Sequence, residues 1–240
     1  MTVNNINDAP SFTQGPNQTV NEDAGAQTVN AWATAISPGP SESGQTVSFQ
    51  ITGNTNAALF TVAPAVSVTG ALSYTPAADA FGSATISVRL QDNGGTANGG
   101  VNTSAIQTFT IAVNSVNDEP SFVPGPDQHV NQDAGPQTIP NWIAFMSAGP
   151  ANEASQTLSF QITGNTFPEA FSALPSVSPT GTLSYTPSPD LTNTFGDALI
   201  SIVIKDNGGT ANGGVDTSMV RQFRISVLPS LGAIFRDGFE

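Results

Sequence analysis

The residues of this chain that are best suited to chemistry are those with side-chain oxygens, which can bind a metal ion. The 240 residues include 18 Asp and Glu against 5 Lys and Arg, and they include no cysteine. Calcium suits sites built only from carboxylates, Asn side chains and carbonyls, because it takes about six to eight oxygen ligands in loose geometry. The residues that we expect to ligate such an ion are Glu22, Asp79, Asn117, Asp118, Glu153 and Asp206.

The remaining residues do not assemble into a usual catalytic set. Without cysteine the chain has neither a thiolate nucleophile nor a zinc–thiolate site. The single histidine, His129, has Thr19 as its counterpart in an internal repeat, which argues against a catalytic base. No nucleophile elbow, HExxH motif or phosphate-binding loop occurs. We therefore expect that the protein is not an enzyme, although a glycosidase-like pair of carboxylates stays formally open.

Composition and charge limit the partners that the protein can have. Hydrophobic residues make up 38% of the chain, which is enough for a packed core. Only 10% of the residues are charged, and the formal net charge is −13. Because this charge repels phosphates, we exclude nucleic acid as a partner. No run of eighteen apolar residues occurs, so we expect no membrane-spanning helix.

The sequence repeats itself with a period of about 110 residues, which is the length of a whole domain. DNGGTANGGV occurs at 92–101 and again at 206–215, and SFQITGNT also occurs twice. Because MTVNNINDAP at 1–10 aligns with IAVNSVNDEP at 111–120, we expect the chain to begin inside an earlier copy. The expected domains are the tail of a preceding repeat at 1–8, repeat 1 at 9–116, a linker at 117–120, repeat 2 at 121–228 and a C-terminal tail at 229–240.

Apolar and polar residues alternate within each copy, as they do in half-buried strands. Val47, Phe49 and Ile51 show the pattern in the first copy, and turn residues bracket such runs at short intervals. We expect an all-β fold of two tandem Greek-key β-sandwiches with about seven strands each. Trp32 and Trp142 are expected to anchor the two cores. In the first copy the strands are expected near 12–20, 26–35, 45–52, 60–67, 71–75, 83–91 and 103–114.

Strand order predicts which acidic residues of the first copy lie together. If successive strands run in opposite directions, the loops after the first, third and fifth strands lie at the end where the chain leaves the sandwich. This order places Glu22, with Asp23 and Asp79, beside the exit segment 117–119. The second copy has Gln132 in place of Glu22. We therefore expect a charged end on the first copy that the second copy lacks.

The same argument places acidic residues of the second copy at its opposite end. Glu153 and Asp206, with Asn152 and Asp216, fall in loops that face the exit of the first copy. Acidic residues gathered at one junction repel one another, and a divalent cation reverses the sign of that interaction. Asp206 also begins an Asp-Asn-Gly-Gly turn, for which a turn-forming role and a metal-binding role both stay open.

The linker Val116-Asn117-Asp118-Glu119-Pro120 carries a family resemblance, together with Glu22, a Tyr-Thr-Pro motif and the Asp-Asn-Gly turn. With these motifs the chain resembles bacterial cadherin-like repeats, and the resemblance covers both copies. It implies cadherin- or immunoglobulin-like sandwiches with calcium between tandem domains, which stiffens the rod. The resemblance further implies that Asn117 and Asp118 are linker ligands and that Glu22 is the glutamate supplied by the preceding domain.

The expected function follows from the repeat and the resemblance together. We expect a non-enzymatic extracellular module that forms a calcium-stiffened stalk of a bacterial surface or secreted adhesin, with neighbouring repeats of the same chain as its partners. The alternative is a ligand-binding module that recognises a cell-surface glycan or protein through its glycine-rich loops or a strand edge.

Overall fold

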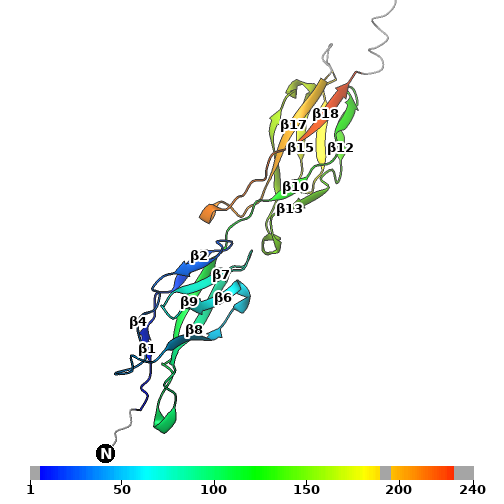
Figure 1. Ribbon diagram of the computed structural model, residues 1–240. Helices are drawn as coiled ribbons and strands as arrows, with labels where there is room; N and C mark the ends of the chain where they lie inside the picture. The colour runs from blue at the N-terminus through cyan, green and yellow to red at the C-terminus, as the bar shows by residue number, and fades with distance from the viewer. Residues whose placement is uncertain (1–5, 190–195, 230–240) are drawn as a thin grey trace, which may run out of the picture. The chain divides into compact units, whose positions relative to one another are not determined.

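The computed structural model describes residues 6–189 and 196–229, and it divides the chain into two compact units (Figure 1). Unit 1 is Met1–Val116 and unit 2 is Asn117–Glu240. The tail of a preceding repeat that we expect at 1–8 is described only from Ile6 onward. The C-terminal tail expected at 229–240 lies outside the described residues except for Pro229.

Unit 1 is a sandwich of a four-stranded and a three-stranded sheet, with a two-stranded pair at its edge. The four-stranded sheet has the order β2-β9-β8-β5, the three-stranded sheet has the order β3-β7-β6, and β1 pairs with β4. β2 runs parallel to β9, and the other pairs are antiparallel. The strands are β1 (Ser11–Thr13), β2 (Gln18–Asn21), β3 (Gln27–Val29), β4 (Thr34–Ser37), β5 (Val47–Asn54), β6 (Phe60–Val66), β7 (Leu72–Pro76), β8 (Gly82–Asp92) and β9 (Gln107–Asn114).

Unit 2 repeats this arrangement strand for strand. Its sheets have the orders β11-β18-β17-β14 and β12-β16-β15, and β10 pairs with β13. The prediction of an all-β chain with two tandem sandwiches is confirmed. The strands are β10 (Ser121–Val123), β11 (Gln128–Asn131), β12 (Gln137–Ile139), β13 (Phe145–Ser147), β14 (Ser159–Asn165), β15 (Phe171–Val177), β16 (Leu183–Pro187), β17 (Gly196–Lys205) and β18 (Arg221–Leu228).

The first two predicted strands of each copy are each divided in the structure. The strand expected at 12–20 becomes β1 and β2, and the strand expected at 26–35 becomes β3 and β4. Trp32 connects the two breaks, because it lies in the bend between β3 and β4 and its indole Nε1 donates to Pro16 O, between β1 and β2, at 3.0 Å. A Cβ on Gly15 would overlap the Trp32 ring, so the chain at this point needs glycine.

The cores confirm the anchoring role that we expect of the two tryptophans. Trp32 is 2% exposed and Trp142 is 3% exposed. Trp32 packs on Phe109 with a centroid distance of 4.3 Å, and Trp142 packs on Phe223 at 4.4 Å. The inward residues of the long strands fill the rest of each core, for example Ile86 of β8, which is fully buried. Alternation therefore predicts the buried faces of β8 and β17 correctly.

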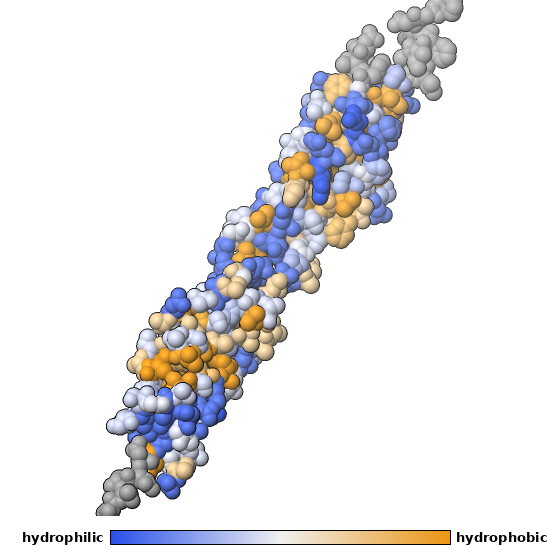
Figure 2. Space-filling model, in the orientation of Figure 1, coloured by the Kyte–Doolittle hydropathy of each residue, from blue (hydrophilic) through white to orange (hydrophobic). Residues whose placement is uncertain are grey.

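The face of the molecule seen in Figure 2 is mostly hydrophilic or neutral, with apolar side chains in scattered groups. Exposed apolar residues include Val123 and Phe145 on the β10–β13 pair of unit 2, which are 51% and 55% exposed. Among residues 6–189 and 196–229, no helix has the length and apolar composition needed to cross a membrane.

Candidate metal centre

Glu22 places a buried carboxylate at the C-terminal end of unit 1. It directly follows β2, and its backbone N donates to Asn114 O of β9 at 2.9 Å. The carboxylate Oε1 accepts a hydrogen bond from Val116 N at 2.7 Å, so Glu22 holds the point where the chain leaves the unit. The side chain is 2% exposed, and within the described residues its Oε2 has no hydrogen-bond partner.

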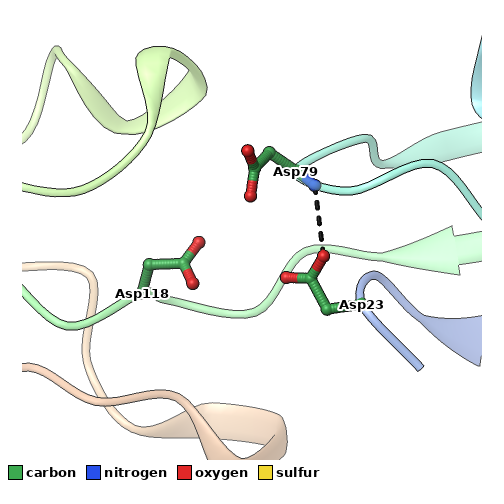
Figure 3. A group of neighbouring side chains, drawn as sticks. All are labelled: Asp23, Asp79 and Asp118. Atoms are coloured by element: carbon green, nitrogen blue, oxygen red, sulfur yellow. Dashed lines mark hydrogen bonds between the residues drawn. The ribbon is translucent and has the colours of Figure 1, made fainter. Parts of the chain in front are cut away.

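Asp23 and Asp79 lie at the same end of unit 1 and are exposed. Asp79 N donates to Asp23 Oδ1 at 3.3 Å, as Figure 3 shows. Both residues have positive φ angles, 61° for Asp23 and 55° for Asp79, in tight turns. We call Glu22, Asp23 and Asp79 the exit cluster. The ion pairs found within residues 6–189 and 196–229 lie in unit 2, so these pairs do not neutralise the exit cluster.

Asn117 is the centre of the candidate site at the N-terminal end of unit 2. Its side chain is 9% exposed. The amide Nδ2 donates to Asp206 Oδ1 at 3.0 Å and to Val215 O at 2.8 Å. The amide Oδ1 accepts from Gln156 Nε2 at 2.8 Å, and the backbone O accepts from Val215 N at 2.9 Å. The linker is therefore bound to unit 2 through both its backbone and its side chain.

Asp118 and Glu153 form the second contact of the linker with unit 2. Asp118 N donates to Glu153 Oε1 at 3.1 Å. Glu153 ends a short 3₁₀ helix, Ala151–Glu153, and is only 4% exposed. A Cβ on Gly149 would overlap Glu153 Oε2, so this glycine leaves the room that the carboxylate occupies. The structure thus brings a second buried carboxylate to the linker.

Asp206 completes this set at the end of β17. It is 8% exposed, and its Oδ1 accepts from Gly208 N at 2.9 Å as well as from Asn117. Within the described part of the chain its Oδ2 has no hydrogen-bond partner. The Asp-Asn-Gly-Gly turn therefore forms as a turn and still leaves a carboxylate oxygen available to an ion. We call Asn117, Asp118, Glu153, Gln156 and Asp206 the entry cluster of unit 2.

The structure distributes the six residues that the sequence predicts as ligands over these two ends. Glu22 and Asp79 belong to the exit cluster, and the other four belong to the entry cluster of unit 2. Asp216 lies at the same end, as expected, because its backbone O accepts from Asp206 N at 3.2 Å, and its carboxylate pairs with Lys205 at 3.5 Å. A hydrogen bond from Thr217, and to a smaller extent Lys205, holds the pKa of the Asp216 carboxyl below its ordinary value. The role of the six residues as ligands stays a prediction.

Unit 1 has an entry cluster of its own, which the sequence argument missed. Asn7 Nδ2 donates to Asp92 Oδ1 at 3.0 Å and to Val101 O at 2.8 Å, and Asp8 N donates to Glu42 Oε1 at 3.1 Å. The alignment of residues 1–10 with 111–120 held the signal, but the charge argument considered only the junction between the copies. The members are Asn7, Asp8, Glu42, Gln45 and Asp92.

The donor set fits a hard divalent cation. In the exit cluster and the entry cluster of unit 2, the buried atoms without a hydrogen bond to the described residues include Glu22 Oε2, Asp206 Oδ2 and Gln156 Oε1, which are oxygen acceptors. A buried carboxylate without a partner costs several kcal/mol, and a bound cation offsets this cost. With no cysteine available and only carboxylate and amide oxygens present, calcium fits better than zinc.

Comparison with known proteins connects this geometry to a fold. No protein-family model matches the sequence, and no curated protein matches it. The crystal structure of human Protocadherin-24 EC1-2 is 16% identical, with a TM-score of 0.52 over 94% of this chain and 100% of that chain. Its Form II structure is 15% identical, with a TM-score of 0.56 over 93% and 100%. The chain has a cadherin-like fold. At these identities the likeness is one of fold alone.

Proposed function

We propose that the chain is a non-enzymatic, extracellular tandem-repeat module in which calcium at the linker stiffens the pair of repeats. It would serve as part of the stalk of a bacterial surface or secreted adhesin, with neighbouring repeats of the same chain as its partners. One observation carries the proposal: buried carboxylates with unsatisfied oxygens occur on both sides of the linker, Glu22 before it and Asp206 after it.

The chain is short between its contacts with the two clusters. Val116 is bonded to Glu22 of the exit cluster, and Asp118 is bonded to Glu153 of the entry cluster. Val116 and Asp118 are two positions apart in the chain. Their Cα atoms are therefore at most ~7.6 Å apart, because consecutive Cα atoms are about 3.8 Å apart. This limit holds for any orientation of the two units. Within unit 1, Asp23 and Asp79, drawn in Figure 3, are joined by the hydrogen bond from Asp79 N to Asp23 Oδ1.

Electrostatics gives the ion its stiffening effect. Without a cation the carboxylates on either side of the linker repel one another, and with calcium each is attracted to the same charge. Extracellular calcium modules bind with a dissociation constant of about 10⁻⁴–10⁻³ M. A free concentration of 100 times that constant stabilises the bound form by about 2.7 kcal/mol. The linker would be ordered outside the cell, where calcium is plentiful.

Thermal melting in calcium and in chelator tests this proposal. The wild type should melt at a higher temperature in calcium, whereas Asp118→Asn should lose most of the difference because it removes a charged ligand. Asp133→Asn is the matched control, since Asp133 is an exposed acid outside the exit and entry clusters. It should keep the calcium effect of the wild type. Identical curves for wild type and Asp118→Asn under both conditions would contradict the proposal.

Ligand binding is the second candidate function, and an exposed apolar pair favours it. Val123 of β10 lies directly across from Phe145 of β13, and both are more than half exposed. A cell-surface glycan or protein could use such an aromatic surface. Binding to a glycan array that persists in chelator and is lost in Phe145→Ser would support this function. If no such binding is found, the stalk function is the remaining candidate.

A further inference from the structure

Both the NH₂ group and the amide oxygen of Asn117 take part in hydrogen bonds with protein groups. Its two Nδ2 hydrogens go to Asp206 Oδ1 and Val215 O, and its Oδ1 accepts from Gln156 Nε2. A Cβ on Gly208 would overlap Asn117 Oδ1, so the amide oxygen lies tightly against the turn. The interactions of Asn117 are therefore with protein groups of unit 2.

The neighbouring groups fix the orientation of the Asn117 side-chain amide. Asp206 Oδ1 and Val215 O are both acceptors, so only the NH₂ group can face them. A carboxylate in the same place would meet the Asp206 carboxylate at hydrogen-bond distance, where like charges repel. The site therefore selects asparagine over aspartate, although aspartate is the better calcium ligand.

Unit 1 repeats this arrangement independently. Asn7 Nδ2 donates to Asp92 Oδ1 and Val101 O, and Asn7 Oδ1 accepts from Gln45 Nε2 at 2.7 Å. Val101 N donates to Asn7 O at 3.0 Å, as Val215 N does to Asn117 O at 2.9 Å. A Cβ on Gly94 would overlap Asn7 Oδ1. Two copies of one arrangement indicate a structural requirement of the repeat.

We infer that the linker asparagine is a positioning residue, which docks the linker onto the following repeat before any metal binds. The Asp-Asn-Gly-Gly turn is the receptor for its amide, with Asp206 and Gly208 as the selecting residues in unit 2. The inference rests on the proposed function for its second part: Asp118, Glu153 and Asp206 supply the carboxylates for the ion, and Asn117 places them.

Hydrogen exchange in chelator tests the docking without any metal. The Val215 amide bonds to Asn117 O, so wild-type Val215 should be protected in chelator as well as in calcium. Asn117→Asp should speed its exchange about tenfold or more, because hydrogen bonds to charged groups are worth that factor at least. Asn7→Asp is the matched control: it should speed the exchange of the Val101 amide and leave the exchange rate of the Val215 amide unchanged. Protection of Ile200 in β17 shows in each variant that unit 2 stays folded.

A double variant separates positioning from ligation. In Asn117→Asp with Asp206→Asn, the new carboxylate can accept from the new amide, so Val215 should regain part of its protection in chelator. If Asn117 were only a metal ligand, no such recovery would be expected, since the double variant replaces both the Asn117 amide and the Asp206 carboxylate. Wild-type Val215 protected only in calcium, or an unchanged rate in Asn117→Asp, would overturn the inference. A missing calcium effect on melting would overturn the proposed function and leave the docking intact.

Discussion

The C-terminal ends of the two units share a backbone hydrogen bond and differ in charge. In unit 1, Glu22 N donates to Asn114 O at 2.9 Å, and in unit 2, Gln132 N donates to Leu228 O at 3.0 Å. Both residues follow a strand that is paired in parallel with the last strand of the unit. The turns that follow differ: Asp23 has a φ of 61°, whereas in unit 2 Ala134 N donates to Asn131 O at 3.1 Å. The backbone hydrogen bond to the last strand forms around a neutral glutamine, so it does not require the charge of Glu22, whose Oε2 remains for a role such as metal binding.

The N-terminal ends of the units, in contrast, are alike in the residues that bond to the Asn-Asp pair of the linker, although unit 2 adds a bond from Met219 N to Glu119 Oε1 at 2.7 Å. The end that receives a linker is built twice, with hydrogen bonds that differ by about 0.1 Å between the copies. The C-terminal end has a buried glutamate, Glu22, in unit 1 and Gln132 at the same position in unit 2. The comparison teaches that docking of the linker is part of the repeat, whereas the charge at the exit is a separate property that a repeat can have or lack.

The largest effect that we expect concerns the independence of the two cores. Trp32→Ala should destabilise unit 1 by about 3–5 kcal/mol, because it removes a buried indole and leaves a cavity. Trp142 is the only other tryptophan, so its fluorescence in this variant reports unit 2 alone. In chelator, the denaturant midpoint of unit 2 should stay where it is. An equal fall in the denaturant midpoints of both units would show that their cores are coupled, which would contradict their independence.

The next effect concerns the exit charge itself. Glu22→Gln gives unit 1 the neutral residue of unit 2, so the calcium-dependent stabilisation of about 2.7 kcal/mol at saturation should fall by at least half. Melting in chelator should stay equal or rise, because the variant removes a buried charge that no cation neutralises, while the glutamine Oε1 can still accept from Val116 N. Gln132→Glu is the matched control and should lower the melting temperature in chelator. A Glu22→Gln chain with the full calcium response would remove Glu22 from the site.

The smallest effect is a pH dependence restricted to unit 2. A hydrogen bond from Ser226, and then the Arg224 guanidinium at 2.5 Å, lower the pKa of the Asp197 carboxyl. A lowered folded-state pKa stabilises the fold above the unfolded value of 3.8, and this contribution is lost as the pH falls through the folded pKa. Unit 1 has Ser83 and Ala112 at the positions of Asp197 and Ser226.

Acid titration of stability measures this difference. Asp197→Ser should lower the stability of unit 2 at pH 7 by a small amount, and the gap to wild type should close as the pH falls below 3.8. Unit 1 should show no change in the same experiment. A gap that persists at acid pH would show that Asp197 acts through packing and not through its charge.

Local sequence patterns predicted part of the sheets and the position of Glu22 in the exit cluster. Alternation identifies the inward residues of β8, and the order of strands places Glu22 where the chain leaves unit 1. The breaks between β1 and β2 and between β3 and β4 could not be predicted in this way. They depend on the packing of the Trp32 ring against Gly15, which is a tertiary contact.

The interactions of the linker asparagine were also beyond local patterns. Asn117 and Asp206 are 89 residues apart, and neither position shows by itself that one donates to the other. The repeat did carry part of the information, since each Asn-Asp-x-Pro segment is accompanied by an Asp-Asn-Gly-Gly turn in the repeat that follows. Residue type alone predicts a ligand at this position, and only the geometry shows that its amide is already in use.

Distance measurement between the two units tests the central claim most directly. The chain has no cysteine, so Ser48→Cys and Ser159→Cys place one spin label on β5 and one on β14, both at exposed positions. Pulsed electron paramagnetic resonance should give a narrow distance distribution in calcium and a broad one in chelator. Asp118→Asn should stay broad under both conditions. A wild-type distribution of the same width with and without calcium would contradict the account.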